Sequence, residues 1–520
     1  MKAHLVGGGL ASMAAAAYLI RDGGVLPSNV TIYEESDSLG GCLIKAGDPE
    51  SGYILPTGRI FEREYRCAFD LFAMIPAASD PHISVKDEIL AFNARYGYFD
   101  RCHIFDRDLN VVRSAHFGLS ARDRLALVKF LLIPQHMLEG RVIEEFFSPA
   151  FFKTEFWTLW LTLMFSQPQH SALEMQIFVL RFLHLLPDFS EMTKILRTRV
   201  NQYEAIALPM SRWLERQGVN FNAGAYVTDI GFKPSKSEIT ANSLTFLHAG
   251  QAETVEVGPQ DVVLVTNGSQ LADLAIGSQT AAPELHLTGR SWALWERLAR
   301  GRPEFGDPNV FFGEHNVADA QWLSITVTDG DGRFFDRVSS LTGAEPGRGG
   351  LITLRDSSWL LTFALFHQPE FLDQPASLRT WWGFGMYPGR IGDFVRKPLR
   401  DCSGAEILDE LLRHLRFDDD RERILESSTC VPCLLPFAGS VWLKRRRKDR
   451  PAVIPEGSTN FGFIGQYAEV PDEANYTMEY SVRSARVAVS GLLKLQTHAP
   501  PIYQGVRDPR VLYEVVSALV

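Results

Sequence analysis

Short apolar runs alternate with longer amphipathic stretches in the N-terminal part of the chain. The run AHLV at positions 3–6 is followed by glycines, and an alanine-rich stretch then continues with helical spacing to Asp22. A second apolar run, VTIY, fills positions 30–33. Short apolar runs bounded by turns predict buried strands, and the periodic stretch between them predicts a helix. The pattern therefore indicates a strand–helix–strand unit of an α/β fold.

Helical and strand patterns continue to alternate after this unit. Residues 121–196 have helical spacing rich in phenylalanine, leucine and tryptophan, and the apolar stretch 156–165 is too short to span a bilayer. Two further helices are predicted near residues 62–72 and 475–495. Strand patterns fill residues 219–221, 227–232, 262–265 and 461–464, and another apolar run lies within 350–366.

The first turn carries glycines in the spacing of a dinucleotide-binding loop. Gly7 permits a tight turn, Gly9 lets the backbone approach a pyrophosphate, and Ser12 is small enough for close packing of helix on strand. Glu34 follows the second strand, where a carboxylate can accept hydrogen bonds from an adenosine ribose. The pair Gly40-Gly41 soon afterwards is frequent in FAD-binding chains. We therefore expect FAD rather than NAD, and NADP least of all.

This layout predicts an α/β protein with a Rossmann-like FAD-binding domain made of separated segments. We assign to that domain residues 1–78, 196–275 and 455–495. A mixed α+β substrate domain is expected from 79–120 and 276–454, with a helical cap at 121–195 and a C-terminal tail at 496–520. The predicted cofactor residues are Gly7, Gly9, Leu10, Ala11, Ser12, Glu34, Glu35, Gly40, Gly41, Gly58, Arg59, Asn267, Gly268, Ser269 and Gly465.

Composition narrows the class of protein. Charged residues make up 22% and hydrophobic residues 46% of the chain, which excludes disordered and fibrous proteins. The formal net charge is −10, which disfavours a nucleic-acid binder. Cys430 and Cys433 form a CxxC without a second ligand pair, so we interpret them as buried thiols. The strand pattern that begins at Ala3 leaves no room for a signal peptide, and we expect a cytoplasmic protein.

One basic run, KRRRKDR, occupies Lys444 to Arg450. The favoured interpretation is a solvated loop, since most charge runs are exposed. The alternative is peripheral contact with an anionic membrane or an acidic partner, to which each basic residue near the surface contributes about 1 kcal/mol.

Several long strings carry a resemblance to a known family. They are VGGGLASMAAAAYLIRDG (6–23), HSALE (170–174), VTNGS (265–269), FGMYPGRIGDFVRKPL (384–399), IPEGSTNFGFIGQ (454–466), EYSVRSARVAV (479–489) and PPIYQG (500–505). Over almost its whole length the chain resembles the FAD-dependent oleate hydratases, formerly called myosin-cross-reactive antigens. The resemblance implies an enzyme that adds water to an isolated double bond of a free fatty acid. It also implies bound FAD, working best as reduced FADH2, without net redox change.

At the catalytic positions of that family the sequence departs from the pattern. The family's RGGREM segment corresponds to residues 56–61, in which Gly58 and Arg59 remain but the water-activating glutamate becomes Ile60. By the same resemblance, the tyrosine that donates the proton becomes Phe178. Alkyl and phenyl groups cannot transfer protons. The predicted substrate pocket is Ile60, Phe61, Phe178, Ala364 and Phe366.

The positions that bind the fatty-acid carboxylate are also changed. The three polar residues of the family pattern become Ala364, Phe366 and Glu370. An ionised Glu370 would repel a substrate carboxylate, and leaving that carboxylate buried without a partner costs several kcal/mol. A neutral apolar substrate such as a polyene, polyketide or terpenoid is therefore favoured over a free fatty acid bound in the usual way.

Other titratable residues are candidates to replace the lost catalytic groups. His367 and Glu370 follow the changed carboxylate positions, and His170 and Glu174 belong to the retained HSALE string. Glu62 and Glu64 lie shortly after Ile60 in sequence. For each one taken alone, a structural role is the more common one, because histidines and glutamates in apolar helices are usually hydrogen-bonded. Reduced flavin is a further candidate proton donor.

Three hypotheses about function remain open. The first is an FAD-dependent hydratase acting on a double bond of a lipid-like substrate. The second is a double-bond isomerase or cyclase on the same scaffold, which the loss of the water-activating glutamate favours. The third is a flavin-binding protein without catalytic activity that binds a lipid or a partner.

Overall fold

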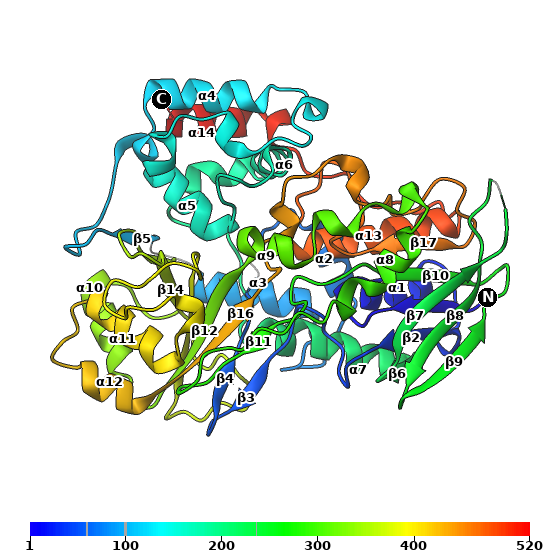
Figure 1. Ribbon diagram of the computed structural model, residues 1–520, viewed down its shortest axis with the longest axis horizontal. Coiled ribbons are helices and arrows are strands. Elements are labelled where there is room, and N and C mark those ends of the chain that lie inside the picture. Colours follow the sequence, from blue (N-terminus) through cyan, green and yellow to red (C-terminus); the bar gives the residue numbers. More distant parts are fainter. Residues whose placement is uncertain (59–60, 98–100, 236, 520) are drawn as a thin grey trace.

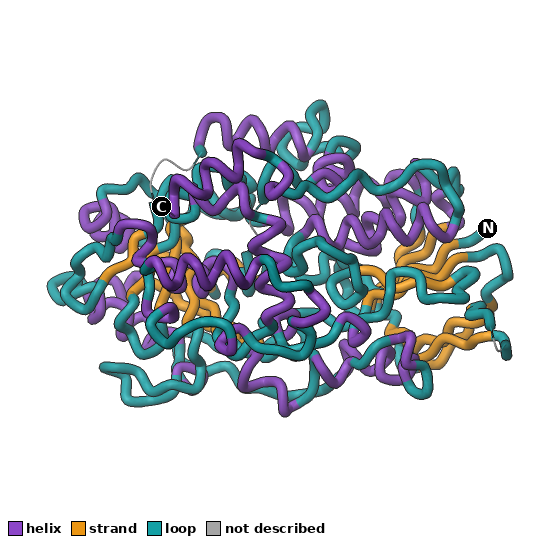
Figure 2. The backbone as a smooth tube through the Cα atoms, turned by 90° about the horizontal axis from the view of Figure 1, so that it is seen from above, coloured by secondary structure: helices purple, strands orange, loops and turns teal. Residues whose placement is uncertain are grey.

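The computed structural model describes residues 1–58, 61–97, 101–235 and 237–519, and its fold is α/β (Figure 1). Two sheets lie at opposite ends of the molecule, and a group of helices at the top of Figure 1 lies above the larger of them. The N-terminus lies at the end with the smaller, parallel sheet, while the C-terminus lies in the upper helices (Figures 1 and 2).

The parallel sheet has the Rossmann-like arrangement that the first turn predicts. Its order is β17-β10-β1-β2-β6. These strands are β1 Ala3–Val6, β2 Val30–Glu34, β6 Asn220–Ala223, β10 Val262–Thr266 and β17 Phe461–Ile464. The chain thus assembles one sheet from its first, middle and last segments, which pair in register from Val6 to Val265 and from Val265 to Phe463. All four residues of β1 are buried, as expected for a strand covered on both faces.

Two helices pack on each other and on this sheet. They are α1 Leu10–Arg21 and α13 Met478–Leu492. The alanines 14–17 of α1 have no exposed surface, because side chains without a γ-carbon let the helix approach its neighbours closely. A three-stranded antiparallel sheet lies beside them, with strands β7 Tyr226–Phe232, β8 Ala241–His248 and β9 Gln251–Glu256.

The larger sheet is mostly antiparallel, with the order β11-β16-β12-β15-β14-β13-β5. Its strands are β5 His103–Phe105, β11 Ala275–Ile276, β12 Trp322–Asp329, β13 Ile352–Leu354, β14 Leu361–Leu365, β15 Arg379–Gly385 and β16 Ser428–Leu435. Helices α10 Arg333–Thr342, α11 Gly404–His414 and α12 Arg421–Ser427 lie on the left of it in Figure 1. The thiols of Cys430 and Cys433 are buried on β16.

Four helices form the cap: α4 Ala121–Leu131, α5 Glu155–Met164, α6 Ala172–Arg181 and α14 Pro509–Leu519. Side-chain oxygens of Ser120, Thr154 and Ser171 accept from backbone N–H groups in the first turns of α4, α5 and α6. Helix α14, from the predicted tail, contacts the short turn Leu183–Asp188 below it. Among the described residues, none of the helices combines the length and apolarity needed to cross a bilayer.

Some segments lie against a different sheet from the one their predicted domain implies. The hairpin β3 Ala46–Asp48 and β4 Gly52–Ile54 falls in the predicted cofactor segment, yet β4 contacts β12 and β16 of the larger sheet. Helix α3 Val85–Tyr96 falls in the predicted substrate segment, yet its Val85 and Ile89 belong to the core around the parallel sheet.

The remaining helices are α2 Arg66–Phe72, α7 Leu208–Gln217, α8 Arg290–Ala299 and α9 Glu314–Ala320.

Candidate active site

The glycine turn after β1 lies close to two other segments of the chain, at Thr266 and at Gly41. Gly7 has φ +90°, and a Cβ there would lie 2.1 Å from Oγ1 of Thr266 on the neighbouring strand. A Cβ on Gly41 would lie 2.8 Å from the Cα of Gly9. Gly9 itself begins α1 in an extended conformation, so the free N–H groups of the first helical turn face the space in front of the turn.

A cavity of about 570 Å³ lies in front of this turn. It is lined by predicted cofactor residues from all three segments of the sheet: Gly7, Gly9, Leu10, Ala11, Glu34, Glu35, Gly40, Gly41, Asn267, Gly268, Ser269 and Gly465. Ser12 is fully buried beneath the turn. Glu34 accepts a hydrogen bond from the N–H of Gly8 at 2.5 Å, while Glu35 forms a 2.5 Å ion pair with Arg290 at the rim.

The residues of this cavity fit FAD. The side chain of Asn267 is only 2% exposed, and neither its nitrogen nor its oxygen has a hydrogen-bond partner within the described part of the chain. A buried amide without partners is costly, and a polar ligand in the cavity would satisfy it. The helix N-terminus and the close approach at Gly9 and Gly41 suit a pyrophosphate, and Glu34 lies at the strand end where a ribose is bound.

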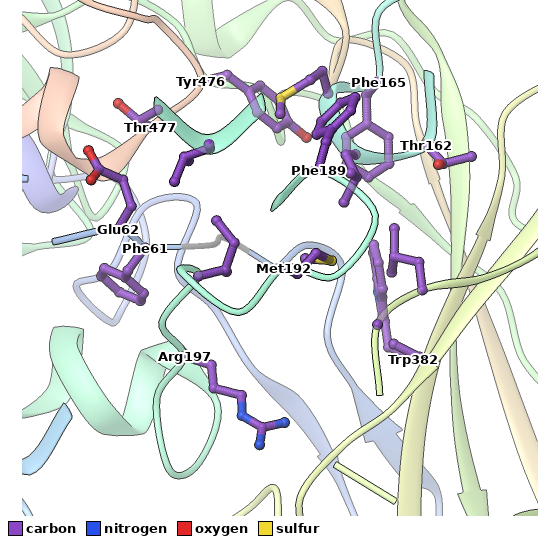
Figure 3. Close-up of a pocket in the computed structure, with 18 of the residues that line it drawn as sticks. Phe61, Glu62, Thr162, Phe165, Phe189, Met192, Arg197, Trp382, Tyr476 and Thr477 are labelled. Carbon is purple, nitrogen blue, oxygen red and sulfur yellow. The ribbon is translucent and has the colours of Figure 1, made fainter. Parts of the chain in front are cut away.

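A second, more apolar cavity of about 240 Å³ adjoins the first. Its walls come from cap helices, from strands β14 and β15 of the larger sheet, and from the segment before α13 (Figure 3). Thr477 lines both cavities and marks the place where they meet. The two cavities therefore share part of a wall at Thr477.

The predicted substrate-pocket residues lie in this wall. Phe61, Phe178, Ala364 and Phe366 all line the apolar cavity. Gly58, which was expected to contact the flavin, also lines this cavity. Arg59 and Ile60 lie outside the described residues. The roles of these residues in binding stay predictions.

Three polar residues gather on one side of the apolar cavity. Glu370, His367 and Arg197 line it, and Figure 3 shows Arg197 on the opposite side from Tyr476 and Thr477. Burial, helped by the charge of Glu204, raises the pKa of Glu370 well above its usual range despite the opposing effect of Arg197. Burial and Arg197 lower the pKa of His367.

These pKa directions correct one expectation. An ionised Glu370 was expected to repel a substrate carboxylate, but desolvation raises the pKa of Glu370 and so favours its neutral form. A neutral carboxylic acid donates a hydrogen bond to a polar group of a ligand instead of repelling it. Sequence reasoning missed Arg197, which no local motif marks.

The two other catalytic candidates have structural partners and lie away from both cavities as the described residues define them. Glu174 is 1% exposed and forms ion pairs with Arg445 at 2.5 Å and Arg450 at 2.9 Å. His170 bonds the N–H of Gln167 through Nδ1 at 2.9 Å and the carbonyl of Asp319 through Nε2 at 2.8 Å. Burial lowers the pKa of His170 to about 4, so it is neutral in the fold.

The same contacts correct the interpretation of the basic run. Arg445 and Arg450 are each 2% exposed, and both form ion pairs with Glu174, while Glu469 lies 3.0 Å from Arg445. Neither arginine belongs to a solvated loop or can face a membrane. Only Lys444, Arg446 and Lys448 of the run are exposed.

A buried charge network reaches the apolar cavity through Glu62. This carboxylate contacts Arg181 at 3.0 Å and His184 at 3.3 Å, and Arg181 contacts Glu473 at 2.8 Å. Burial opposes ionisation of Glu62, but His184 and Arg181 outweigh it and lower its pKa. Glu62 is therefore a carboxylate at the cavity wall, and a cap helix is tied to it through Arg181.

The network continues into α13. Arg483 contacts Glu473 at 3.0 Å and Glu479 at 2.8 Å. Burial and the neighbouring Glu473 raise the pKa of Glu479 to about 7. Three carboxylates and two guanidinium groups thus share one buried region, together with the imidazole of His184 beside Glu62.

Comparisons with known proteins find a matching family model and similar sequences. A family model described as MCRA family matches residues 1–490. The chain is 33% identical over 521 residues to an oleate hydratase of Streptococcus pyogenes serotype M49 (strain NZ131), covering 98% of this chain and 88% of that protein. It is 29% identical over 562 residues to a linoleate hydratase of Lactiplantibacillus plantarum, covering 100% and 98%.

Solved structures similar to this fold include two amine-oxidising enzymes. Wild-type putrescine oxidase bound to putrescine gives a TM-score of 0.56 at 14% identity, covering 95% of this chain and 99% of that chain. Cyclohexylamine oxidase from Brevibacterium oxydans IH-35A gives 0.54 at 12% identity, covering 95% and 98%. At such identities the likeness concerns the fold alone.

Proposed function

Because the chain belongs to the MCRA family, we propose that it adds water across a carbon–carbon double bond of an unsaturated, lipid-like substrate. It is a flavoprotein of the oleate hydratase family and binds FAD. The observation that carries the proposal is the apolar cavity that meets the cofactor cavity at Thr477. A long apolar chain fits such a cavity, and its double bond can then lie near the flavin.

The two sides of the apolar cavity differ in the chemistry of the residues that line them. Phenylalanines such as Phe165, Phe178 and Phe189 exclude water and hold the apolar part of the substrate. On the far side, Arg197 with neutral His367 and Glu370 offers donors to a polar group of the substrate. We therefore assign His367 and Glu370 to substrate binding. When bound, FAD would supply a polar ring at the opposite end of the apolar cavity, near Thr477. We propose that the active form of the cofactor is FADH2.

A second candidate function follows from the apolar lining itself. The phenyl group of Phe178 cannot transfer protons, and its ring centre lies 4.4 Å from that of Trp442. A substrate cation formed in such surroundings has little water to react with. Loss of a proton or ring closure would then give an isomerase or cyclase acting on a neutral polyene, polyketide or terpenoid.

Isotope labelling separates the candidates. The FAD-loaded protein, oxidised or chemically reduced, is incubated in ¹⁸O-labelled water with oleate, linoleate and a panel of neutral polyenes and terpenoids. We expect one labelled oxygen in the product by mass spectrometry, without consumption of O₂ or nicotinamide cofactor. A product of unchanged mass would show that the protein catalyses isomerisation or cyclisation instead of hydration. Bound flavin with every substrate unchanged would reject an enzyme and favour a flavin- and lipid-binding protein.

A further inference from the structure

Tyr476 is a buried phenol at the junction of the two cavities. It lines the apolar cavity, is 8% exposed, and directly precedes Thr477, which both cavities share. Figure 3 shows its ring extending from the side of Thr477 toward Phe165 and Phe189, with the hydroxyl group at the end nearer these two rings. Within the proposed reaction a proton must reach one carbon of the double bond, and a phenol is a group that can donate it.

The chain fixes Tyr476 through its two neighbours. Asn475 donates from its amide to the carbonyl of Gln466 at 2.5 Å and accepts from the N–H of Tyr476 at 2.6 Å. Thr477 donates to the carbonyl of Ala474 at 2.9 Å and caps α13 by accepting from the N–H of Tyr480 at 3.1 Å. Gln466 lines the cofactor cavity, so Asn475 links the backbone of Tyr476 to a residue of that cavity.

The backbone at this residue is unusual. Tyr476 has φ +69°, in the left-handed region that a bulky side chain rarely adopts. Strain of this kind persists only where the surroundings enforce it, and it concentrates at functional sites. Here the bonds of Asn475 and Thr477 enforce it, and they aim the phenol into the cavity.

Tyr476 and Phe178 border the same part of the cavity from different elements. The ring of Phe178 lies 4.4 Å from that of Trp442, and the ring of Tyr476 lies 6.4 Å from it. Phe178 occupies the position where the resemblance to oleate hydratases places a proton-donating tyrosine. Phe178 on α6 has no hydroxyl group. Tyr476, on the segment before α13, is a phenol that lies near the same Trp442 ring.

We propose that Tyr476 is the catalytic residue that donates the proton to the double bond. This inference rests on the proposed hydration. The hydroxyl proton of Tyr476 forms a bond with one alkene carbon as the π bond breaks, and the oxygen of water forms a bond with the other carbon. The water loses one proton, and that proton restores the phenol. No electrons enter or leave the protein, and alkene plus water becomes alcohol.

A spectral titration tests the position of the phenol without any substrate. The flavin absorption spectrum of the FAD-loaded protein is followed from about pH 7 to about pH 11, a range in which the flavin N3–H and exposed phenols ionise. We expect Tyr476→Phe to change the wild-type titration curve, because it removes a hydroxyl group next to the cofactor cavity, and Tyr53→Phe to retain that curve. Tyr53 is equally a buried phenol, stacked on Phe371 at 4.1 Å, and it belongs to neither cavity lining as described. An unchanged titration in Tyr476→Phe would overturn the proposal.

Turnover tests the chemistry on a substrate that the wild-type protein converts. Tyr476→Phe should lower kcat by about 10²- to 10⁴-fold with little change in KM, because the phenol acts in the transition state. Phe178→Tyr, added to Tyr476→Phe, should restore at least about tenfold of kcat, since it returns a phenol to the same indole. Near-normal kcat in Tyr476→Phe would reject the assignment. A wild-type protein that converts nothing would instead reject the proposed function, and the spectral titration would still judge Tyr476.

Discussion

At the scale of single residues, Glu370 is an acid whose neutral form is favoured by burial, which raises its pKa. Its folded pKa is raised above the unfolded value by burial, so its contribution to stability is complete below the unfolded pKa and is lost as pH rises through the folded pKa. Glu370→Gln keeps the shape without the charge. The variant should match wild type at about pH 4 and have a higher urea midpoint at about pH 8. Equal midpoints at both pH values would show that Glu370 is ionised in the fold.

Gly9 offers a residue-scale test of the cofactor cavity. Its φ of −79° is open to any residue, and an added Cβ would meet only the Cα of Gly41 at 3.6 Å, an ordinary contact. Gly9→Ala should therefore fold normally but place a methyl group where the pyrophosphate approaches. We expect FAD affinity to fall at least about tenfold, which is about 1.4 kcal/mol, in a flavin fluorescence titration. The control is Gly389→Ala, where an added Cβ meets nothing within 4 Å.

The residue scale also shows what sequence spacing can and cannot find. Gly7, Gly9 and Glu34 were predicted because one strand–turn–helix unit contains their whole geometry. Arg197 and Tyr476 were missed because their relation to the cavity arises from segments distant in sequence. The proton-transfer role therefore looked absent when only Phe178 was considered.

At the scale of elements, Glu174 joins the cap to the segment after β16. It is the partner of two buried arginines, so Glu174→Gln leaves guanidinium charge uncompensated in the interior. We expect a loss of about 3–5 kcal/mol in unfolding free energy, measured by urea denaturation of the FAD-loaded protein. The exposed ion pair of Glu514 with Lys194 on the same cap is the control, and Glu514→Gln should cost less than about 1 kcal/mol.

The outcome for Glu174 also decides between two roles. A variant with wild-type stability and no turnover would return Glu174 to the catalytic candidates. The sequence suggested catalysis because Glu174 lies one helical turn before Phe178, on the same predicted face. The structure pairs it with Arg445 and Arg450, more than two hundred and fifty residues away in sequence. Charge runs and helix spacing are local signals and do not reveal such partners.

At the scale of the whole molecule, the sequence predicted the parallel sheet from three separated segments and the helical cap. Strong periodicity and the glycine turns carry that information, because each describes one element and its ends. It did not predict that β3 and β4 pack on the larger sheet, that α3 joins the core of the parallel sheet, or that α14 joins the cap. Those placements depend on which apolar faces are left uncovered once the sheets have formed.

The charge network from Glu62 to Glu479 connects these parts and makes their association depend on pH. It links Arg181 of the cap to Arg483 and Glu479 of α13, and Glu479 accepts from the N–H groups of Cys67 and Ala68 at the start of α2. The pKa of Glu479 rises from 4.5 to about 7 on folding. Its stabilising effect is therefore complete below the unfolded pKa and is lost as pH rises through about 7.

Glu479→Gln removes that titration while keeping an acceptor for the start of α2. Wild-type stability should fall from about pH 5 to about pH 8 by more than that of the variant, and urea midpoints of the FAD-loaded proteins measure the difference. Glu64→Gln is the control, because Glu64 pairs with Arg66 near the surface and should leave the pH slope unchanged. A Glu479→Gln slope equal to wild type would show that Glu479 is not the group that makes the stability of the network depend on pH.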